Sequence, residues 1–254
     1  MATVGVDAGS LTTKVVVMED SRVLSRSLVH SSVAGAASQG IQEALKACGL
    51  SLEGVKAIVA TGIGKKEVAE ARDTATEIVC DARGALHLVP SAQTVIDIGA
   101  ENSRVIRCDA TGKVVEFVLN DKCAAGTGVF LDAMAKALRV PVSEMGELSL
   151  KSTQDVNITA MCVVFAESEV VSQIHRRLPK EDILNGIHKS IATRLYGMVN
   201  RVGVNKDVVV VGGLARNIGV VRCLEGLVGV DVVVPENPEF VGAVGAALIA
   251  AERS

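Results

Sequence analysis

The chain opens with two short apolar runs, 3-TVGVD-7 and 14-KVVVM-18, on either side of a Gly/Ser/Thr turn. β-Branched residues dominate both runs, so this arrangement predicts a β-hairpin. A third strand is expected near 23-VLSRSLV-29. The segment 36-AASQGIQEALKACG-49 has apolar residues at helical spacing, which predicts an amphipathic helix ended by Gly49.

A buried strand at 55-VKAIVATG-62 and a helix at 76–89 complete this first pattern. The order then restarts at 94-TVIDIGAENSRVIRCD-109, which again predicts strand, Asp-x-Gly turn and strand. Further elements are expected as a strand at 113–120, helices at about 127–138, 163–178 and 181–202 (ended by Gly203), strands at 207–213 and 230–235, and a terminal helix from about 239.

The order β-β-β-α-β-α therefore occurs twice, starting near residues 3 and 94. Duplication on this scale predicts two related α/β lobes with a cleft between them, and such clefts are preferred ligand sites. We expect the lobes to be residues 1–91 and 92–254, with the boundary near 90–93. The terminal helix can cross back to the first lobe.

Composition supports a folded, sheet-based protein. Of 254 residues, 49% are hydrophobic and 22% charged, and aromatic residues make up only 2%. A core of aliphatic side chains suits sheets covered by helices on both faces. The net charge of −3, without a basic stripe, argues against nucleic acid as a partner. No apolar run reaches the roughly 18 residues of a membrane span. Asp7 and Lys14 do not fit a signal peptide, so a cytoplasmic location without membrane partners is expected.

The turn 7-DAGSLTTK-14 has the chemistry of a phosphate-binding loop. Gly9 lets the backbone turn tightly without a Cβ in the way. Asp7, at the strand end, can hold hydrated Mg²⁺ beside phosphates, and Lys14 adds a positive charge. Backbone amides or hydroxyls for phosphate oxygens are predicted from Ser10, Leu11 and Thr12.

The second turn, 97-DIGAEN-102, offers Asp97 and Gly99 in the same arrangement, with Asp97 again able to hold Mg²⁺ through water. A single Asp-x-Gly at a strand end is usually only a structural turn. Two copies in the same hairpin context favour phosphate binding, and the sequence therefore predicts that the protein binds ATP.

Two further glycine clusters are candidate nucleotide contacts. The first, 123-CAAGTG-128, precedes a helix whose free N–H groups can bind an anion, which involves Gly126, Thr127 and Gly128. The second, 211-VGGLARN-217, ends a buried strand, and Gly212 and Gly213 allow a flat ring or ribose to approach the backbone. Alone, this second motif is weak, because strand-Gly-Gly-helix turns are common.

Longer motifs make the chain resemble a known family. The segments 119-LNDKCAAGTGVFLDAMA-135 and 162-CVVFAESEVVSQI-174 are similar to the ATP-dependent activators of 2-hydroxyacyl-CoA dehydratases, in the BadF/BadG/BcrA/BcrD ATPase family. The similarity covers almost the whole chain, including 182-DILNGIHKSIATRL-195 and 242-GAVGAAL-248. The family is part of the sugar kinase, heat-shock and actin ATPase superfamily. The resemblance thus implies an α/β fold of two duplicated actin/hexokinase-like (ribonuclease H-like) lobes around a nucleotide cleft. It adds Ala100, Leu214, Asn217, Gly242 and Ala243 to the expected ATP/ADP contacts.

The resemblance also implies one [4Fe–4S] cluster per homodimer, with Cys123 and Cys162 of each subunit as ligands. ATP binding and hydrolysis would drive an electron to the cluster of a partner iron–sulfur dehydratase or reductase, and a ferredoxin or flavodoxin is the implied donor. From the residues alone, buried structural thiols are the ordinary interpretation of both cysteines. A helix start predicted after each nevertheless favours a thiolate, and a two-fold axis would bring together the four thiolates that a cluster needs. Structural roles are predicted for Cys48, Cys80, Cys108 and Cys223, the last on an apolar helix face.

Other assignments keep their alternatives. Glu167 either contacts the nucleotide or orients water, as the resemblance implies, or belongs to a solvated acidic first turn. The family commonly has D-I-G-G-Q-D where this chain has 97-DIGAENSR-104, which leaves the subgroup open. The partner is a hydroxyacyl-CoA dehydratase, a benzoyl-CoA-type reductase or a double-cubane protein. The alternative functions are a small-molecule kinase of the same superfamily and a nucleotide-dependent scaffold.

Overall fold

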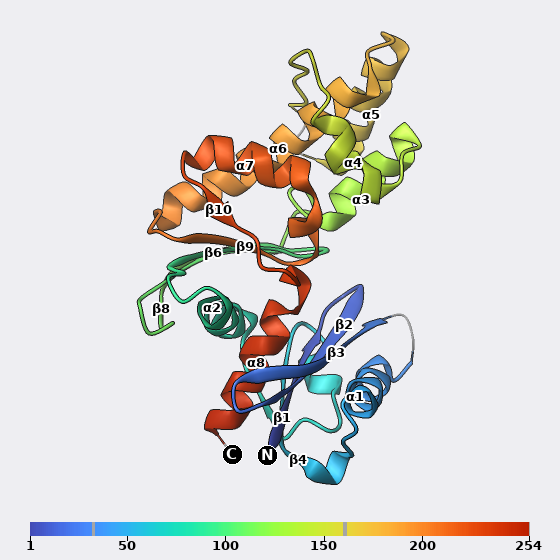
Figure 1. The fold of residues 1–254 in the computed structure, drawn as a ribbon. Helices are drawn as coiled ribbons and strands as arrows, with labels where there is room; N and C mark the ends of the chain where they lie inside the picture. The colour runs from blue at the N-terminus through green and yellow to red at the C-terminus, as the bar shows by residue number, and fades with distance from the viewer. Residues whose placement is uncertain (32–33, 160–161, 254) are drawn as a thin grey trace. The chain divides into compact units, whose positions relative to one another are not determined.

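The computed structural model describes residues 1–31, 34–159 and 162–253 (Figure 1). They form two compact units. The first consists of Met1–Val95, Cys108–Val115 and Pro235–Ser254, and the second of Ile96–Arg107 and Glu116–Val234. The lobe boundary expected near residues 90–93 stays a prediction. Within the described ranges, no helix is both long and apolar enough to cross a membrane.

The sheet of the first unit is formed by β1 (Ala2–Ala8), β2 (Thr12–Glu19), β3 (Arg22–His30), β4 (Val55–Thr61) and β5 (Asp73–Thr74). Its order is β3-β2-β1-β4-β5, with β1 antiparallel to β2 and parallel to β4. The register pairs Asp7 with Lys14 on β2 and with Thr61 on β4. Three strands therefore meet beside Asp7.

The two faces of this sheet bury alternate side chains, as expected for a strand period of two. Val15 and Val17 pack with helix α1 (Ala36–Ala47), whereas Val16 and Met18 pack with helix α8 (Val241–Glu252). α8 also packs against α2 (Glu77–Leu88), β1 and β4. Gly5 permits this close packing, because a Cβ there would overlap the backbone of α8. Short 3₁₀ helices are η1 (Leu52–Gly54), η2 (Lys65–Glu67) and η4 (Pro238–Phe240).

The second sheet contains β6 (Thr94–Ile98), β7 (Ser103–Cys108), β8 (Val114–Asn120), β9 (Val208–Val211) and β10 (Val232–Val233), in the order β10-β9-β6-β7-β8. Its helices are α3 (Gly128–Leu138), α4 (Val142–Ser149), α5 (Val163–His175), α6 (Lys180–Val202) and α7 (Ile218–Val228), with the 3₁₀ helix η3 (Gly213–Arg216). α6 packs against α4 and α7, and α3 packs against α5. One apolar cluster joins Ile96 and Ile98 of the sheet to Phe130, Ile187 and Leu195 of the helices.

The strand and helix order agrees with the sequence prediction, and the ends differ by a few residues. The sequence did not predict α4 or the two-residue β5. α4 has only eight residues, and its buried positions are Met145, Gly146 and Ser149. Because glycine and serine carry no hydrophobic signal, the periodicity of this helix is invisible in the sequence.

Candidate functional site

The turn between β1 and β2 is tight and internally hydrogen-bonded. The N–H of Gly9 donates to the carbonyl of Thr12 at 3.2 Å. A Cβ at Gly9 would lie 2.8 Å from that carbonyl oxygen and 3.1 Å from Lys14 Nζ, so a side chain does not fit. Ser31 holds the turn from outside, because its Oγ donates to Gly9 O at 2.8 Å and its N–H to Leu11 O at 2.9 Å. The turn is thus anchored to the end of β3.

Asp7 and Lys14 form an ion pair beside this turn. Lys14 Nζ lies 3.2 Å from Asp7 Oδ2, and each side chain is 16% exposed. Glycines leave room on two sides of the carboxylate: a Cβ at Gly62 would lie 2.7 Å from Oδ1, and one at Gly242 would lie 3.8 Å from Oδ2. The pair orients the carboxylate that was predicted to hold Mg²⁺ through water. Of the other predicted phosphate contacts, Ser10 and Thr12 are half-buried and Leu11 is exposed.

A second carboxylate, which was not predicted from the sequence, lies near Gly242. Asp81 on α2 is a buried carboxylate, and its Oδ1 lies 3.0 Å from the Cβ position of Gly242. Asp7 and Asp81 therefore both approach the first turn of α8. The side chain of Ala243 instead packs into the core with Val16, so only its backbone can meet a ligand.

The turn between β6 and β7 repeats this geometry. The N–H of Gly99 donates to Asn102 O at 2.9 Å, as the N–H of Gly9 does to Thr12 O. Arg104 Nε lies 3.3 Å from Asp97 Oδ2, with side chains 5% and 12% exposed. Arg104 also donates to Asn102 Oδ1 at 2.7 Å. The cation stands seven residues after the aspartate in both hairpins, a spacing that would have identified Arg104 from the sequence.

The second turn is bonded to the start of α3. The N–H of Gly128 donates to Gly99 O at 3.0 Å, and the N–H of Val129 donates to Ala100 O at 2.9 Å. These are among the helix N–H groups predicted to bind an anion, and they already have partners. Gly126 has a φ of +88°, where glycine is favoured, and Thr127 is fully buried. The hairpin turn and the beginning of α3 therefore form one hydrogen-bonded unit.

The Gly-Gly loop after β9 lies against the second hairpin. Gly212 has a φ of +86°, and a Cβ there would overlap Asp97 Oδ1 and Ile98 O. Gly213 faces open space, since nothing lies within 4 Å of its Cβ position. Leu214 is buried in the core of the second unit. Asn217 caps α7, because its Oδ1 accepts from Val220 N at 3.1 Å, and its buried Nδ2 has no hydrogen-bond partner among the described residues.

Cys123 and Cys162 lie just before two helices that pack together, α3 and α5. Cys123 is half-buried, and its carbonyl accepts from Asn120 Nδ2 at 3.0 Å. Cys162 is exposed and occupies the N-cap of α5, where its carbonyl accepts from Ala166 N at 2.9 Å. In the described ranges, no three His, Cys, Asp or Glu side chains gather into a metal site. One thiol that faces outward suits a metal centre completed by a second chain.

The other cysteines are less reactive. Burial raises the pKa of the Cys80 thiol to about 12 and also raises the pKa of Cys108 and Cys223. Such thiols remain protonated at neutral pH, which suits the structural roles predicted for them. Cys48 is half-buried near the end of α1.

On α5, Glu167 is exposed. Its neighbour Glu169 accepts from the N–H and Oγ1 of Thr159, both at 3.0 Å. Glu169 thus ties the helix to the segment before it, whereas both interpretations of Glu167 stay open.

Two β-sheets, each with the same Asp-x-Gly hairpin, define the fold of sugar kinases and actin-like ATPases. The chain matches the BadF/BadG/BcrA/BcrD ATPase family over residues 4–250 and belongs to it. It is 42% identical over 256 residues to the (R)-2-hydroxyglutaryl-CoA dehydratase activating ATPase of Acidaminococcus fermentans, covering 99% of this chain and 98% of that protein. It is 41% identical over 256 residues to the activator of lactoyl-CoA dehydratase of Anaerotignum propionicum, covering 100% and 99%.

Solved structures agree with the family. The activator of the 2-hydroxyisocaproyl-CoA dehydratase from Clostridium difficile, with bound ADPNP, matches with a TM-score of 0.95 at 40% identity, over 100% of this chain and 95% of that one. A ROK family glucokinase from Streptomyces griseus shares the fold alone, with a TM-score of 0.61 at 15% identity, over 99% of this chain and 100% of that one. The actin/hexokinase-like fold expected from the sequence is confirmed.

Proposed function

We propose that this protein is the ATPase activator of a 2-hydroxyacyl-CoA dehydratase and that it passes single low-potential electrons to the iron–sulfur cluster of that enzyme. The observation that carries the proposal is the pair of hydrogen bonds from the start of α3 to Gly99 O and Ala100 O. They join a candidate phosphate hairpin to the segment that begins with Cys123. A movement of this hairpin on phosphate binding can therefore be transmitted through the start of α3 to the segment that contains Cys123.

Phosphate binding is assigned to both hairpins. In the first, phosphate oxygens compete with Asp7 for Lys14, whose side chain remains partly exposed. In the second, Arg104 is held by both Asp97 and Asn102, so its main effect is to orient the carboxylate. Both aspartates are acceptors for the water ligands that Mg²⁺ usually keeps. The relative with bound ADPNP supports the nucleotide assignment.

Cys123 and Cys162 are assigned as the ligands that each chain contributes to a [4Fe–4S] cluster. When bound, such a cluster supplies a one-electron carrier of low reduction potential. Cys162 occupies the N-cap of α5, and the N-terminal end of a helix attracts a negatively charged group such as a thiolate-ligated cluster. Two thiolates from each chain make four only in a homodimer, so the proposal includes a two-fold axis beside α5.

The substrate of the partner is proposed only as a class. The chain is 42% identical to a 2-hydroxyglutaryl-CoA dehydratase activator and 41% identical to a lactoyl-CoA dehydratase activator. Nearly equal similarity to both supports a partner that acts on a 2-hydroxyacyl-CoA without selecting its acyl chain. A ferredoxin or flavodoxin is the proposed electron donor.

Anaerobic purification followed by iron analysis and EPR spectra, with and without ATP, tests the proposal. We expect four iron atoms per dimer and Mg²⁺-dependent ATP hydrolysis. Cys123→Ala and Cys162→Ala should each give colourless protein that still binds ATP, whereas the control Cys48→Ala should stay brown. A full [4Fe–4S] spectrum in Cys123→Ala would show that the ligand assignment is wrong. Transfer of the γ-phosphate to a small molecule would favour a kinase instead.

A further inference from the structure

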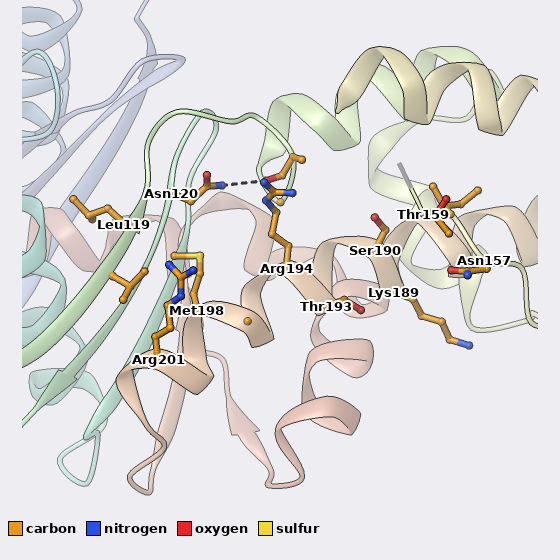
Figure 2. A pocket seen from close by; sticks show the side chains of 15 residues that line it. Leu119, Asn120, Asn157, Thr159, Lys189, Ser190, Thr193, Arg194, Met198 and Arg201 are labelled. Carbon is orange, nitrogen blue, oxygen red and sulfur yellow. Dashed lines mark hydrogen bonds between the residues drawn. The ribbon is translucent and has the colours of Figure 1, made fainter. Parts of the chain in front are cut away.

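A groove of about 630 Å³ lies in the second unit between the C-terminal end of β8 and one face of α6 (Figure 2). The helix wall contains Ser190, Thr193, Arg194, Met198 and Arg201. Their spacing of three and four residues places them on a single helix face. Asn157 and Thr159 stand at the end of the groove where Lys189 lies.

The charge of this groove is one-sided. Its lining includes Lys189, Arg194 and Arg201 but no carboxylate among the described residues. Lys189 is paired with Asp155 at 2.5 Å. In the part of the chain that the structure describes, neither arginine forms an ion pair. Since the whole chain has a net charge of −3, this is a local excess of positive charge.

Between the two arginines, the helix wall leaves open space. Gly197 and Met198 lie between the two arginines, and nothing stands within 4 Å of the Cβ position of Gly197. The opposite wall is β8, the edge strand of its sheet in the described residues, where Leu119 is 45% exposed. An edge strand offers main-chain donors and acceptors to an extended segment of another protein. Arg194 and Arg201, seven residues apart, are separated by about 10 Å along the helix.

The groove also touches the Cys123 segment. Asn120 lines it and donates to the carbonyls of Cys123 at 3.0 Å and Ala125 at 3.1 Å. A Cβ at Gly126 would lie 3.1 Å from Arg194 Cδ, so the loop packs directly on this arginine. A molecule that engages Arg194 therefore sits against the loop that carries Cys123.

We infer that the groove between β8 and α6 docks an acidic surface segment of an electron-transfer protein. The inference rests on the function proposed above, because the redox role of the Cys123 loop determines what kind of protein docks there. Two carboxylates about 10 Å apart would meet Arg194 and Arg201, whose guanidinium groups bind carboxylates in a bidentate manner. Between the two arginines, the open space over Gly197 would admit the backbone or a side chain of the docked segment.

Binding of an acidic ferredoxin to the anaerobic holoprotein, measured by biolayer interferometry at low and high salt, tests the inference. Arg194→Gln and Arg201→Gln should each weaken binding about threefold at low salt, and the double variant about tenfold with a flatter salt dependence. Arg222→Gln is the matched control, since Arg222 is exposed on α7 outside the groove, and it should change the affinity less than about twofold.

Gly197→Glu is a second variant that does not depend on losing an arginine. Glutamate is a better helix former than glycine, so folding is preserved, while the new carboxylate occupies the groove and repels an acidic partner. We expect it to weaken binding as much as the double variant. Unchanged binding in either, an equal loss in Arg222→Gln, or no binding by the wild type would overturn the inference.

Iron content and ATP hydrolysis are measured on the same samples. If both are present and the groove variants bind normally, only the docking inference fails. Wild-type protein without iron would contradict the proposed function whatever the binding result.

Discussion

The two Asp-x-Gly hairpins have the same internal geometry and different attachments. In each, the glycine N–H bonds to the carbonyl three residues later, and a cation seven residues after the aspartate pairs with it. The first turn is held by Ser31, at the end of its own sheet. The second is held by the first turn of α3. Both hairpins thus have the same aspartate, glycine and cation, but a movement of the first turn would be transmitted to Ser31 and a movement of the second to α3.

The two cations also differ in freedom. Among the described residues, Lys14 has one ionic partner and is 16% exposed, whereas Arg104 is 5% exposed and bridges Asp97 and Asn102. A planar guanidinium held by two acceptors is a fixed structural element, and a lysine ammonium on a flexible chain can change partners. Lys14 is therefore the cation that can change partners, whereas Arg104 orients Asp97.

Replacing the cation of each hairpin in turn should show most clearly how Lys14 and Arg104 differ. Arg104→Met removes the cation beside the buried carboxylate of Asp97 and should lower the free energy of unfolding by about 3 kcal/mol. Lys14→Met should lower it by only about 1 kcal/mol, because the Lys14 side chain is more exposed than that of Arg104 and water can replace it beside Asp7, but should reduce ATP affinity about tenfold. Urea denaturation and nucleotide titration measure both effects. A larger stability loss in Lys14→Met than in Arg104→Met would contradict the comparison.

Acid should weaken the second unit before the first. His188 of α6 is fully buried beside Ser149, and burial lowers its pKa from 6.5 to about 4. Below pH 6.5, His188 is protonated in the unfolded chain but remains neutral in the folded chain. Its contribution to the free energy of unfolding is therefore fully present above pH 6.5 and is lost as the pH falls toward about 4. The loss amounts to about 3 kcal/mol. In the first unit, His30 and His87 are exposed.

Hydrogen exchange at a series of pH values measures this difference. Amides of α6 should lose protection before those of β1 and β2, and His188→Gln should remove most of the acid dependence. If that variant shows the same acid dependence as the wild type, another group is responsible.

One of the two hydrogen bonds that link the second hairpin to α3 can be removed at a single atom. Gly128 is the first residue of α3, where proline is tolerated, and the preceding Thr127 is already extended. Gly128→Pro removes the N–H that bonds Gly99 O, at a cost of about 1 kcal/mol. ATP should still bind, but it should change the rate at which iodoacetamide alkylates Cys123 in the iron-free protein less than it does in the wild type, because only the Val129 N–H bond to Ala100 O remains.

Gly128→Ala is the matched control, because it adds a Cβ and keeps the N–H. It should preserve the effect of ATP on alkylation. Ser31→Ala instead removes the side-chain bond to Gly9 O that helps to hold the first hairpin, and it should weaken ATP binding while leaving the coupling intact. Loss of coupling in Gly128→Ala would mean that the side chain, rather than the hydrogen bond, matters.

The smallest effect is expected where this chain departs from the family pattern. Ala100→Gly restores the common glycine and should lower the free energy of unfolding by about 0.5 kcal/mol, because glycine has more freedom in the unfolded chain. The carbonyl that accepts from Val129 N is unchanged, so ATP hydrolysis should stay within about twofold. A tenfold change would identify residue 100 as a determinant of the hydrolysis rate.

Features that depend on neighbours in the chain were predictable from the sequence. Both hairpins, the strand order and the long helices follow from periodicity and turn residues, whose interactions are local. Arg104 was predictable too, since it follows Asp97 at the spacing at which Lys14 follows Asp7. α4 was not, because its buried side is formed by Met145, Gly146 and Ser149 rather than by a hydrophobic stripe.

The sequence by itself determined the duplicated fold, the family and the residue types available for phosphate and iron–sulfur chemistry. Only the tertiary structure decided how those residues are connected. It bonds the N–H groups of Gly128 and Val129 to the second hairpin instead of leaving them for an anion. It commits Asn217 to capping α7, and it brings Arg194 against Gly126. These contacts join segments far apart in the chain, and local propensity does not encode which donor meets which acceptor once helices and sheets have packed.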